Sequence, residues 1–586
     1  MKSSTSVETF EQGKAKEEAL LTSFDKFVSL TYRLFSRPAT RLSVRMPSLR
    51  KDIQRSNMRT TPEGLISVAM FSTIITAAVT IPLTFILVDA TRILFFYFLP
   101  VAIPMVFLLV INMPKASSSS RAAALNNELP FILGYMSILA GGGVSPMAAF
   151  RRISQMDLLP ASEKEAKRIL IETDVFGQDP ITAMENVSRS TPSRPFSEFL
   201  VGYTAILKTG GNLEAYVSQK LKDTVAAKGA SIKRSSDITG TLAESYLTVT
   251  VVLGMTLYTL DMIQVLLSHS NAGLVQLYFF AFLIIPIISA AFIFLLDSTA
   301  PKWPYTDYRP MKPLAYTIPI AVVIFFIPLP IPLYLHTAIA LISSVIYPAF
   351  LAIKYSRERR SLERVLPDFI RDVAEGRKTG LSPEKAIERL STRPYGPLSP
   401  YVAKMGSQLS WGIELSGVVK SFTTSVASWI ARVIGTLLVE VVDVGGGTVR
   451  SFSEMADFSR SVSDMENDRR ASLRPFIVIT YIAGVMTIVS TFIMVYMLQQ
   501  PGSLGFAATV LNKSTIDNLL TTAVFDTFII GLVAGKMGES SLSDGFKHAI
   551  LLTTISVIAV LIFRSLTPGC PSVVDGVTSW AKCPFP

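Results

Sequence analysis

The chain has few of the residues that build catalytic or metal sites. It contains only two cysteines and three histidines in 586 residues, and no two histidines have the spacing of metal ligands. A Gly-x-x-x-x-Gly-Lys-Ser/Thr phosphate loop is also missing. The nearest pattern, Gly531, Gly535 and Lys536, has the wrong spacing and lacks the hydroxyl residue. We therefore expect no enzymatic activity, no catalytic residue, no cofactor, no metal site and no ATP hydrolysis by this chain itself.

Charge is scarce as well. Only 17% of the residues are charged, 49% are apolar, and the mean hydropathy is +0.43. An ordinary soluble domain carries about 25% charged residues, so this balance indicates an integral membrane protein. Uncharged runs such as 65–88 and 93–113 are long enough to cross a hydrocarbon layer of about 30 Å as single helices.

Nine spanning helices are predicted. The long apolar stretch at 314–353 must hold two of them, because Pro328, Pro330 and Pro332 interrupt it. The predicted order is a basic amphipathic cytoplasmic tail (1–64), two spans (65–113), a cytoplasmic helical domain (114–241), two spans (242–297), two spans (314–353), a second cytoplasmic helical domain (354–474), three spans (475–565) and an external tail (566–586).

Basic residues give the orientation. When the amino terminus is placed in the cytoplasm, most Lys and Arg residues near the span ends lie inside, among them Arg359, Arg360, Arg469, Arg470 and Arg474. Four fall outside: Arg92, Lys513, Arg564 and Lys582. This asymmetry follows the positive-inside rule. It predicts a multi-pass protein of the cell (cytoplasmic) membrane with a cytoplasmic N-terminus and an external C-terminus.

One segment of the chain occurs twice. Eight residues recur without a gap at a constant spacing of 237 positions: Leu129, Pro130, Gly143, Ser145, Pro146, Ala149, Arg152 and Ser154 reappear as Leu366, Pro367, Gly380, Ser382, Pro383, Ala386, Arg389 and Ser391. Each copy follows a pair of predicted spans. We infer a parallel duplication, and predict an all-α fold with about nine transmembrane helices and two homologous cytoplasmic helical-bundle domains.

The repeated phrase is first a structural motif. In GVSP and GLSP, Gly143 or Gly380 would end one helix in a left-handed turn. Ser145 or Ser382 would cap the next helix, and Pro146 or Pro383 would occupy its first position, where a missing N–H costs nothing. We expect Gly380→Val to unfold the second domain.

Basic residues gather near both copies of the motif. They are Arg151 and Arg152 in the first copy and Arg371, Arg377, Lys378 and Arg389 in the second. Two interpretations stay open: a contact surface for an acidic partner such as an ATPase, or ordinary solvated helix faces.

Longer motifs carry a family resemblance. LPDFIRDVAEGRKTGLSPEKAIERLS, YGPLSPYVAKMGSQLSWGIEL and VVDVGGGTV closely resemble the second cytoplasmic domain of the platform proteins of archaeal type IV filaments, which belong to the type II secretion F superfamily. GGGVSPMAAF, YTAILKTGGNLEAYV and GTLAESYL resemble the first domain. The basic tail and the extreme carboxyl end are not covered.

The resemblance implies a function and partners. The implied protein is the membrane platform at the base of an archaellum or pilus, acting in motility or protein secretion. It would form a homodimer, dock a hexameric secretion ATPase and couple the motion of that ATPase to the insertion of pilin or archaellin subunits into the filament. Membrane lipids are further expected partners, and no nucleic acid is expected.

The two ends of the chain carry separate expectations. The tail has an apolar stripe of Leu20, Phe24, Phe27, Val28, Thr31, Leu34 and Phe35 at helical spacing, followed by a basic stretch. It would lie on lipid headgroups or pack on the protein's own cytoplasmic domains.

At the other end, Cys570 and Cys583 would form a disulfide on the oxidising exterior, stabilising the tail by roughly 3 kcal/mol, or stay free thiols.

Two acidic residues in apolar runs support a rival function. Asp261 and Asp526 lie inside predicted spans, where ionisable side chains are costly and face the bundle interior or water. A membrane transporter would use such residues. Interhelical hydrogen bonds or an interface for a pilin helix would explain them within a filament platform. A passive membrane scaffold or receptor, which binds a cytoplasmic partner without moving anything, is the other alternative.

Overall fold

All structural elements in the described part of the chain are helices, which confirms the all-α class. The computed structural model describes residues 27–56, 58, 60–91, 100–254, 256, 280–299, 309–328, 330–443, 448–499 and 513–566. Within these residues the chain divides into two compact units. One comprises residues up to 136 together with 144–220, and the other comprises 137–143 and the residues from 221 onward.

Eight helices of the described residues are long and apolar enough to cross a membrane. They are contained in α3 (Pro62–Thr91), α4 (Ala102–Gly141), α12 (Ile285–Thr299, with the preceding turn), α13 (Leu314–Phe326, with the preceding turn), α14 (Leu333–Lys378), α19 (Val449–Gln499), α20 (Lys513–Glu539) and α21 (Leu542–Leu566). The first of the two spans predicted within 242–297 covers residues 245–267 and lies mostly outside the described residues. The total of nine therefore stays a prediction.

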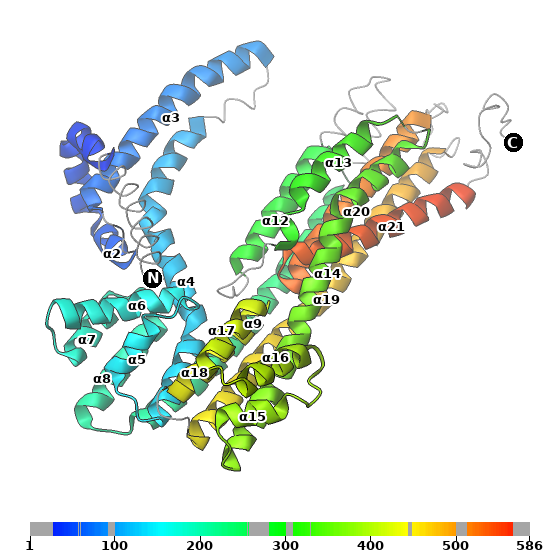
Figure 1. The fold of residues 1–586 in the computed structure, drawn as a ribbon. Helices are drawn as coiled ribbons and strands as arrows, with labels where there is room; N and C mark the ends of the chain where they lie inside the picture. Colours follow the sequence, from blue (N-terminus) through cyan, green and yellow to red (C-terminus); the bar gives the residue numbers. More distant parts are fainter. Residues whose placement is uncertain are drawn as a thin grey trace, which may run out of the picture. The chain divides into compact units, whose positions relative to one another are not determined.

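The first unit combines a helical hairpin with a cluster of short helices. Residues 27–45 are helical, and α2 (Pro47–Ser56) follows them. The cluster at one end of α4 consists of α5 (Pro146–Ile153), α6 (Pro160–Leu170) with the π-helical turn η2 (Ile171–Val175), α7 (Pro180–Ser190), α8 (Arg194–Thr209) and the beginning of α9 (Leu213–Leu247) (Figure 1).

The basic tail packs on the spans of its own unit. Ala39, Leu49 and Ile53 are buried together with residues of α3 and with Ile111 of α4. Leu34 stays 63% exposed. These tail residues therefore contact apolar helices of their own unit, and Leu34 of the predicted apolar stripe is left uncovered. Leu20 and Phe24 of that stripe lie outside the described residues.

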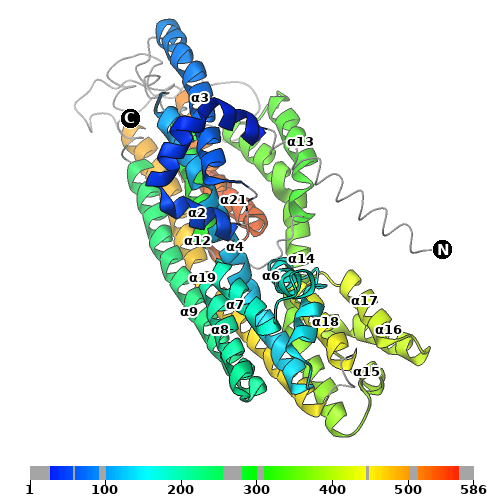
Figure 2. The same ribbon diagram turned by 90° about the vertical axis from the view of Figure 1, so that its left-hand side faces the viewer.

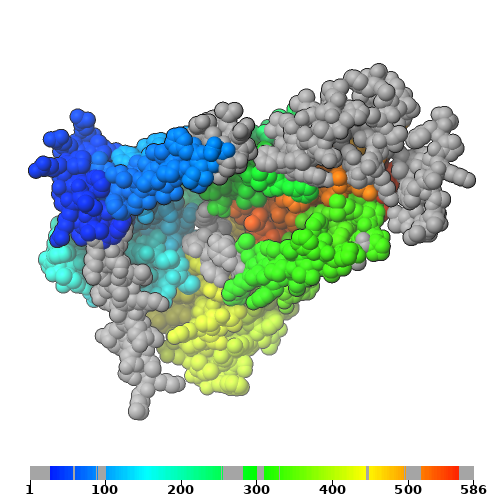
Figure 3. Space-filling model, turned by 90° about the horizontal axis from the view of Figure 1, so that it is seen from above, coloured from blue at the N-terminus to red at the C-terminus, as the bar shows by residue number. Residues whose placement is uncertain are grey.

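The second unit is a membrane-length bundle with its own cluster of short helices. The bundle contains α12, α14, α19, α20 and α21, and the second half of α9 runs along α19, where the Ser236 hydroxyl donates to the Ser472 carbonyl at 3.0 Å (Figure 2). The cluster consists of α15 (Pro383–Leu390), the short turn η6 (Gly396–Leu398), α16 (Ser399–Ser410), α17 (Leu415–Ser425) and α18 (Trp429–Asp443), which project from the bundle as a yellow-green group (Figure 3).

Three helices cross the predicted boundary between membrane and domain without a break. α4, α14 and α19 have 40, 46 and 51 residues and contain both apolar and polar halves. α4 and α14 each have two prolines in the helix interior and α19 has one, but each helix continues through them. The short-helix clusters are therefore joined to the membrane helices by continuous helices rather than by loops.

Candidate functional site

The repeated phrase forms the same turn in both copies. Gly143 has φ 77° and Gly380 has φ 86°, in the left-handed region that favours glycine. The Ser145 hydroxyl accepts the N–H of Ala148 at 3.4 Å, and the Ser382 hydroxyl accepts the N–H of Lys385 at 3.3 Å. A proline occupies the first turn of the helix in each case. This is the local geometry that the sequence pattern predicts.

The structure extends the repeat beyond the motif. Ser193 caps α8 by accepting the N–H of Phe196, and Ser428 accepts the N–H of Ala431 at the start of α18. Each serine also bonds back to a long helix: Ser193 contacts the Asn126 amide oxygen at 2.5 Å, and Ser428 donates to a Glu363 carboxylate oxygen at 2.9 Å.

Asn126 and Glu363 are themselves one repeat apart. Sequence reasoning missed this pair, because an asparagine and a glutamate do not match by identity. The constant spacing of the repeat was the signal that would have found it. The shared link indicates that both clusters fold back on their long helix in the same way.

A polar contact fixes the far end of α15. The Tyr395 hydroxyl donates to Asp372 at 2.6 Å, and Arg393 forms an ion pair with the same carboxylate at 2.7 Å. Burial raises the pKa of the Tyr395 phenol, and the hydrogen bond and charge of Asp372 raise it further, against the opposing effect of Arg393. The phenol therefore stays protonated and remains a donor at neutral pH.

The six basic residues near the motifs have different surroundings. Arg151 and Lys378 form exposed ion pairs with Asp174 at 3.2 Å and with Glu375 at 2.8 Å. Arg152 also interacts within the protein. Surface pairs of this kind are worth little to stability, about 0–1 kcal/mol, and can be exchanged for a partner's charge.

Arg377 has an intramolecular role. Its guanidinium group donates to the Leu381 carbonyl at 2.5 Å and lies over the ring of Phe452, 5.9 Å from its centroid. These contacts hold the turn between α14 and α15 against α19. Arg377 therefore contributes to the shape of the domain whatever it contacts outside.

Arg371 and Arg389 are the two exposed basic residues of this set whose side chains have no partner in the described part of the chain. Neither side chain forms a hydrogen bond or ion pair with any residue that the structure describes. They lie on α14 and α15, on either side of the Gly380 turn. Their charges can meet an external carboxylate without first breaking an internal contact.

The glycines that resemble a broken phosphate loop have a packing role instead. A Cβ on Gly531 would lie 2.3 Å from the Cα of Ala549, and one on Gly535 would lie 2.1 Å from the Cα of Gly545. α20 and α21 therefore touch backbone to backbone, as small residues allow in membrane helices. Lys536 forms an ion pair with Asp297 of α12 at 2.5 Å.

The other candidate residues divide between buried and undescribed positions. Asp526 is fully buried in α20, and the nearby Tyr246 and Ser289 hydroxyls lie 3.1 Å apart. Asp261, Cys570 and Cys583 lie outside the described residues. The hydrogen bonding of Asp261 and the disulfide stay predictions.

Comparisons with known proteins agree with the repeat. The family model for type II secretion system protein F matches residues 132–260 and again 369–496. An uncharacterized protein of Methanocaldococcus jannaschii is 22% identical over 508 residues, which cover 79% of this chain and 83% of the relative. Flagella accessory protein J of the same organism is 20% identical over 434 residues, covering 70% and 76%. No solved structure matches significantly. The two family matches cover the two short-helix clusters and the ends of α4 and α14 that lead into them, so the chain contains two type II secretion system protein F domains.

Proposed function

We propose that this protein is the non-enzymatic membrane platform of a type IV filament assembly machine, an archaellum or an archaeal pilus. The observation that carries the proposal is the pair of type II secretion system protein F domains, each continuous with membrane-length helices. The similarity to a flagella accessory protein supports a filament system. In this proposal both domains face the cytoplasm, with the N-terminus inside and the C-terminus outside, as the basic residues near the span ends predict.

The long helices supply a way to transmit force. At about 1.5 Å per residue, the 46 residues of α14 and the 51 of α19 extend roughly 69 and 77 Å. No loop interrupts either helix between the cluster and the bundle. A push on α15–α18 would therefore tilt or shift the membrane half of the same helices. We propose that a hexameric secretion ATPase supplies this push and that pilin or archaellin subunits respond to it in the membrane, with the platform acting as a homodimer.

The proposed contact for the ATPase includes Arg371 and Arg389. Their exposure and lack of partners among the described residues leave both charges available to an acidic surface. Arg377 and Lys378 flank them, but both already have contacts within the domain. Arg151 and Arg152 would form the matching contact in the first domain.

A charge-reversal experiment tests the platform role against a passive scaffold. The double variant Arg371→Glu/Arg389→Glu should lose co-purification with the cognate ATPase and should also lose filament assembly. A matched control is Arg460→Glu on α19, since Arg460 is similarly exposed, with its nearest carboxylate, Asp464, 3.9 Å away. Loss of ATPase binding with normal filaments would contradict the platform role and favour the scaffold. Normal binding in the double variant would contradict the proposed contact.

A further inference from the structure

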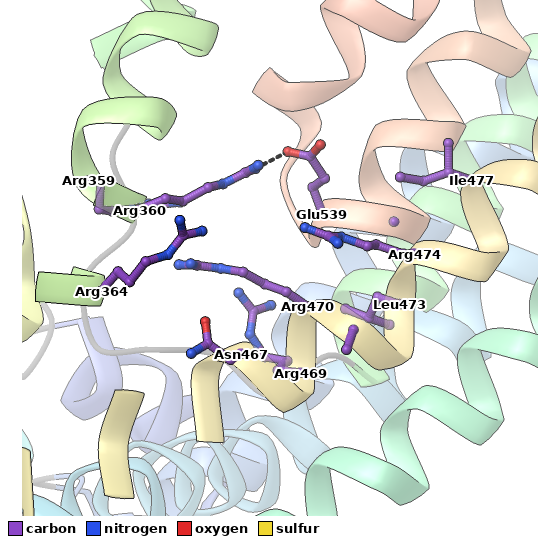
Figure 4. Close-up of a pocket in the computed structure, with 12 residues that line it drawn as sticks. Arg359, Arg360, Arg364, Asn467, Arg469, Arg470, Leu473, Arg474, Ile477 and Glu539 are labelled. Atoms are coloured by element: carbon purple, nitrogen blue, oxygen red, sulfur yellow. Dashed lines mark hydrogen bonds and ion pairs between the residues drawn. The ribbon is translucent and has the colours of Figure 1, made fainter. Parts of the chain in front are cut away.

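A cavity of about 380 Å³ lies in the second unit where α14, α19 and the end of α20 meet. Six of the residues around it are arginines: Arg359, Arg360, Arg364, Arg469, Arg470 and Arg474. Glu539 is the only acidic side chain that lines it. Arg364, Arg470 and Arg474 extend toward one another across the cavity (Figure 4). Its volume falls within the range of about 300–1,000 Å³ that is typical of ligand sites.

Half of the arginines are fixed by ion pairs with carboxylates of the protein itself. Arg469 donates to both oxygens of Glu466 at 2.8 Å. Arg470 pairs with Glu363 at 2.7 Å and with Glu466 at 2.9 Å, and Arg360 pairs with Glu539. These contacts hold the three guanidinium groups in place and join α14 to α19 and α20.

The other arginines have no such partner. The side chains of Arg359, Arg364 and Arg474 form no hydrogen bond or ion pair with any residue in the described part of the chain, although Arg359 lies within electrostatic reach of Asp544. The lining therefore carries more positive than negative charge, and the mutual repulsion of its arginines disfavours the arrangement. A bound anion would remove that repulsion.

Guanidinium groups suit phosphate in particular. Their planar fork donates two parallel hydrogen bonds to phosphate oxygens, and charge-assisted bonds of this kind are roughly twice as strong as neutral ones. The lining adds Asn467, whose amide is a further donor. The chemistry of the cavity therefore favours a phosphate group over a neutral ligand.

The position of the cavity points to the source of that phosphate. On α14, the exposed apolar side chains of Phe350 and Ile353 lie just before the arginines. On α19, Arg474 is followed directly by Pro475 and by exposed Val478. Apolar side chains exposed on a spanning helix face lipid tails, so the cavity lies at the depth of the headgroups.

We propose that this arginine cavity binds a phosphate group, and that the phosphate belongs to the headgroup of an anionic phospholipid in the leaflet that faces the helical domains. The bound headgroup would bridge α14 and α19 at the point where both helices leave the membrane. It would thereby stiffen the connection between the second domain and the bundle. A free phosphate compound is the other source of the same chemistry.

The test measures lipid binding to the full-length protein in a neutral detergent. Short-chain phosphatidylglycerol, short-chain phosphatidylcholine and inorganic phosphate are titrated separately, and native mass spectrometry counts the bound molecules. The test variant is Arg364→Gln/Arg474→Gln, which breaks no internal contact. The control is Arg357→Gln, because Arg357 is an exposed residue of the same helix at a similar depth but does not line the cavity.

The expected result is saturable binding of phosphatidylglycerol and none of phosphatidylcholine. Each arginine removed should weaken binding about five-fold, equivalent to about 1 kcal/mol, so the double variant should bind roughly 25-fold more weakly while the control binds as the wild type does. Inorganic phosphate could instead bind to the wild type and the control and bind more weakly to the double variant. That result would support the phosphate site and assign it to a soluble compound. Equal phosphatidylglycerol binding by all three proteins, or no saturable binding of either phosphate ligand, would overturn the proposal.

A folding check keeps the test decisive. If the double variant melts below the wild type, the single variants Arg364→Gln and Arg474→Gln are compared with Arg357→Gln instead. Each should show the five-fold loss, and an affinity equal to that of the control would count against the site. These measurements need neither the ATPase nor filaments. The lipid site can therefore be refuted while the platform role stands, and the platform role can be refuted while the lipid site stands.

Discussion

Replacing Gly535 by alanine should separate the two most closely packed membrane helices. A Cβ at this position would lie 2.1 Å from both the Cα and the backbone nitrogen of Gly545. Real Cβ atoms essentially never lie closer than 3.0 Å to another heavy atom, and ordinary van der Waals contact begins near 3.4 Å, so α20 and α21 must move apart by about 0.9–1.3 Å. Neither obstacle is a side chain that can rotate away, so the backbone itself has to shift.

The magnitude follows from two opposing effects. Alanine favours the helix over glycine by roughly 1 kcal/mol. Overpacking typically costs about 1–3 kcal/mol, and the rigid backbone obstacle places this case at the upper end. We therefore expect Gly535→Ala to destabilise the protein by about 1–2 kcal/mol net, which should lower the melting temperature by several degrees.

A second glycine gives the matched control. Gly484 lies in α19, and a Cβ there would meet only side-chain atoms, the methyl carbons of Leu552 at 3.2 and 3.3 Å and Cγ2 of Ile530 at 3.7 Å. Those methyl groups can give way, so Gly484→Ala should leave the melting temperature unchanged or raise it slightly. The assay is thermal unfolding of the purified full-length proteins in one detergent. Equal melting temperatures for the two variants would refute the close approach of α20 and α21.

Three further predictions concern the second domain and the carboxyl end. Gly380→Val should destabilise the protein by about 1–2 kcal/mol in thermal unfolding, because a side chain at φ 86° is strained; the open space around Gly380 makes this effect smaller than the unfolding of the second domain that the sequence alone predicts. An unchanged melting temperature would count against the left-handed turn. Ser428→Ala should cost about 1 kcal/mol by the same assay, because α18 loses its cap and Glu363 loses a donor, and a neutral effect would contradict the cap. Non-reducing mass mapping should find Cys570 and Cys583 joined, and alkylation of both would reject the disulfide.

Local chemistry made much of the fold predictable. The apolar runs, the repeat and the Gly-x-Ser-Pro turns depend on residues that are near one another in the chain, and the structure shows the left-handed glycine and the serine cap in both copies. The membrane class followed from composition alone. The continuity of α14 was less evident, because the sequence predicts a boundary between a span and a domain at 353/354, whereas the helix runs through this point and through Pro348 and Pro367.

Long-range packing is the part that the sequence did not reveal. The arginines of the cavity come from α14 and α19, more than 100 residues apart, and the sequence analysis used five of them only as signals of orientation and did not single out Arg364. Gly531 and Gly535 attracted notice as a failed phosphate loop, whereas their role depends on α21 lying against them. No local pattern states which helices will be neighbours, so these sites became visible only in three dimensions.

The account depends most on both helical domains lying on the same side of the membrane. The direct measurement uses single cysteines at Arg151 and Lys378, both exposed, in a background where Cys570 and Cys583 are replaced by serine. A membrane-impermeant maleimide is applied to intact cells and to inverted membrane vesicles. We predict that neither cysteine is labelled in intact cells and that both are labelled in inverted vesicles. Labelling of one cysteine in intact cells and of the other only in inverted vesicles would contradict the parallel duplication and the proposed function.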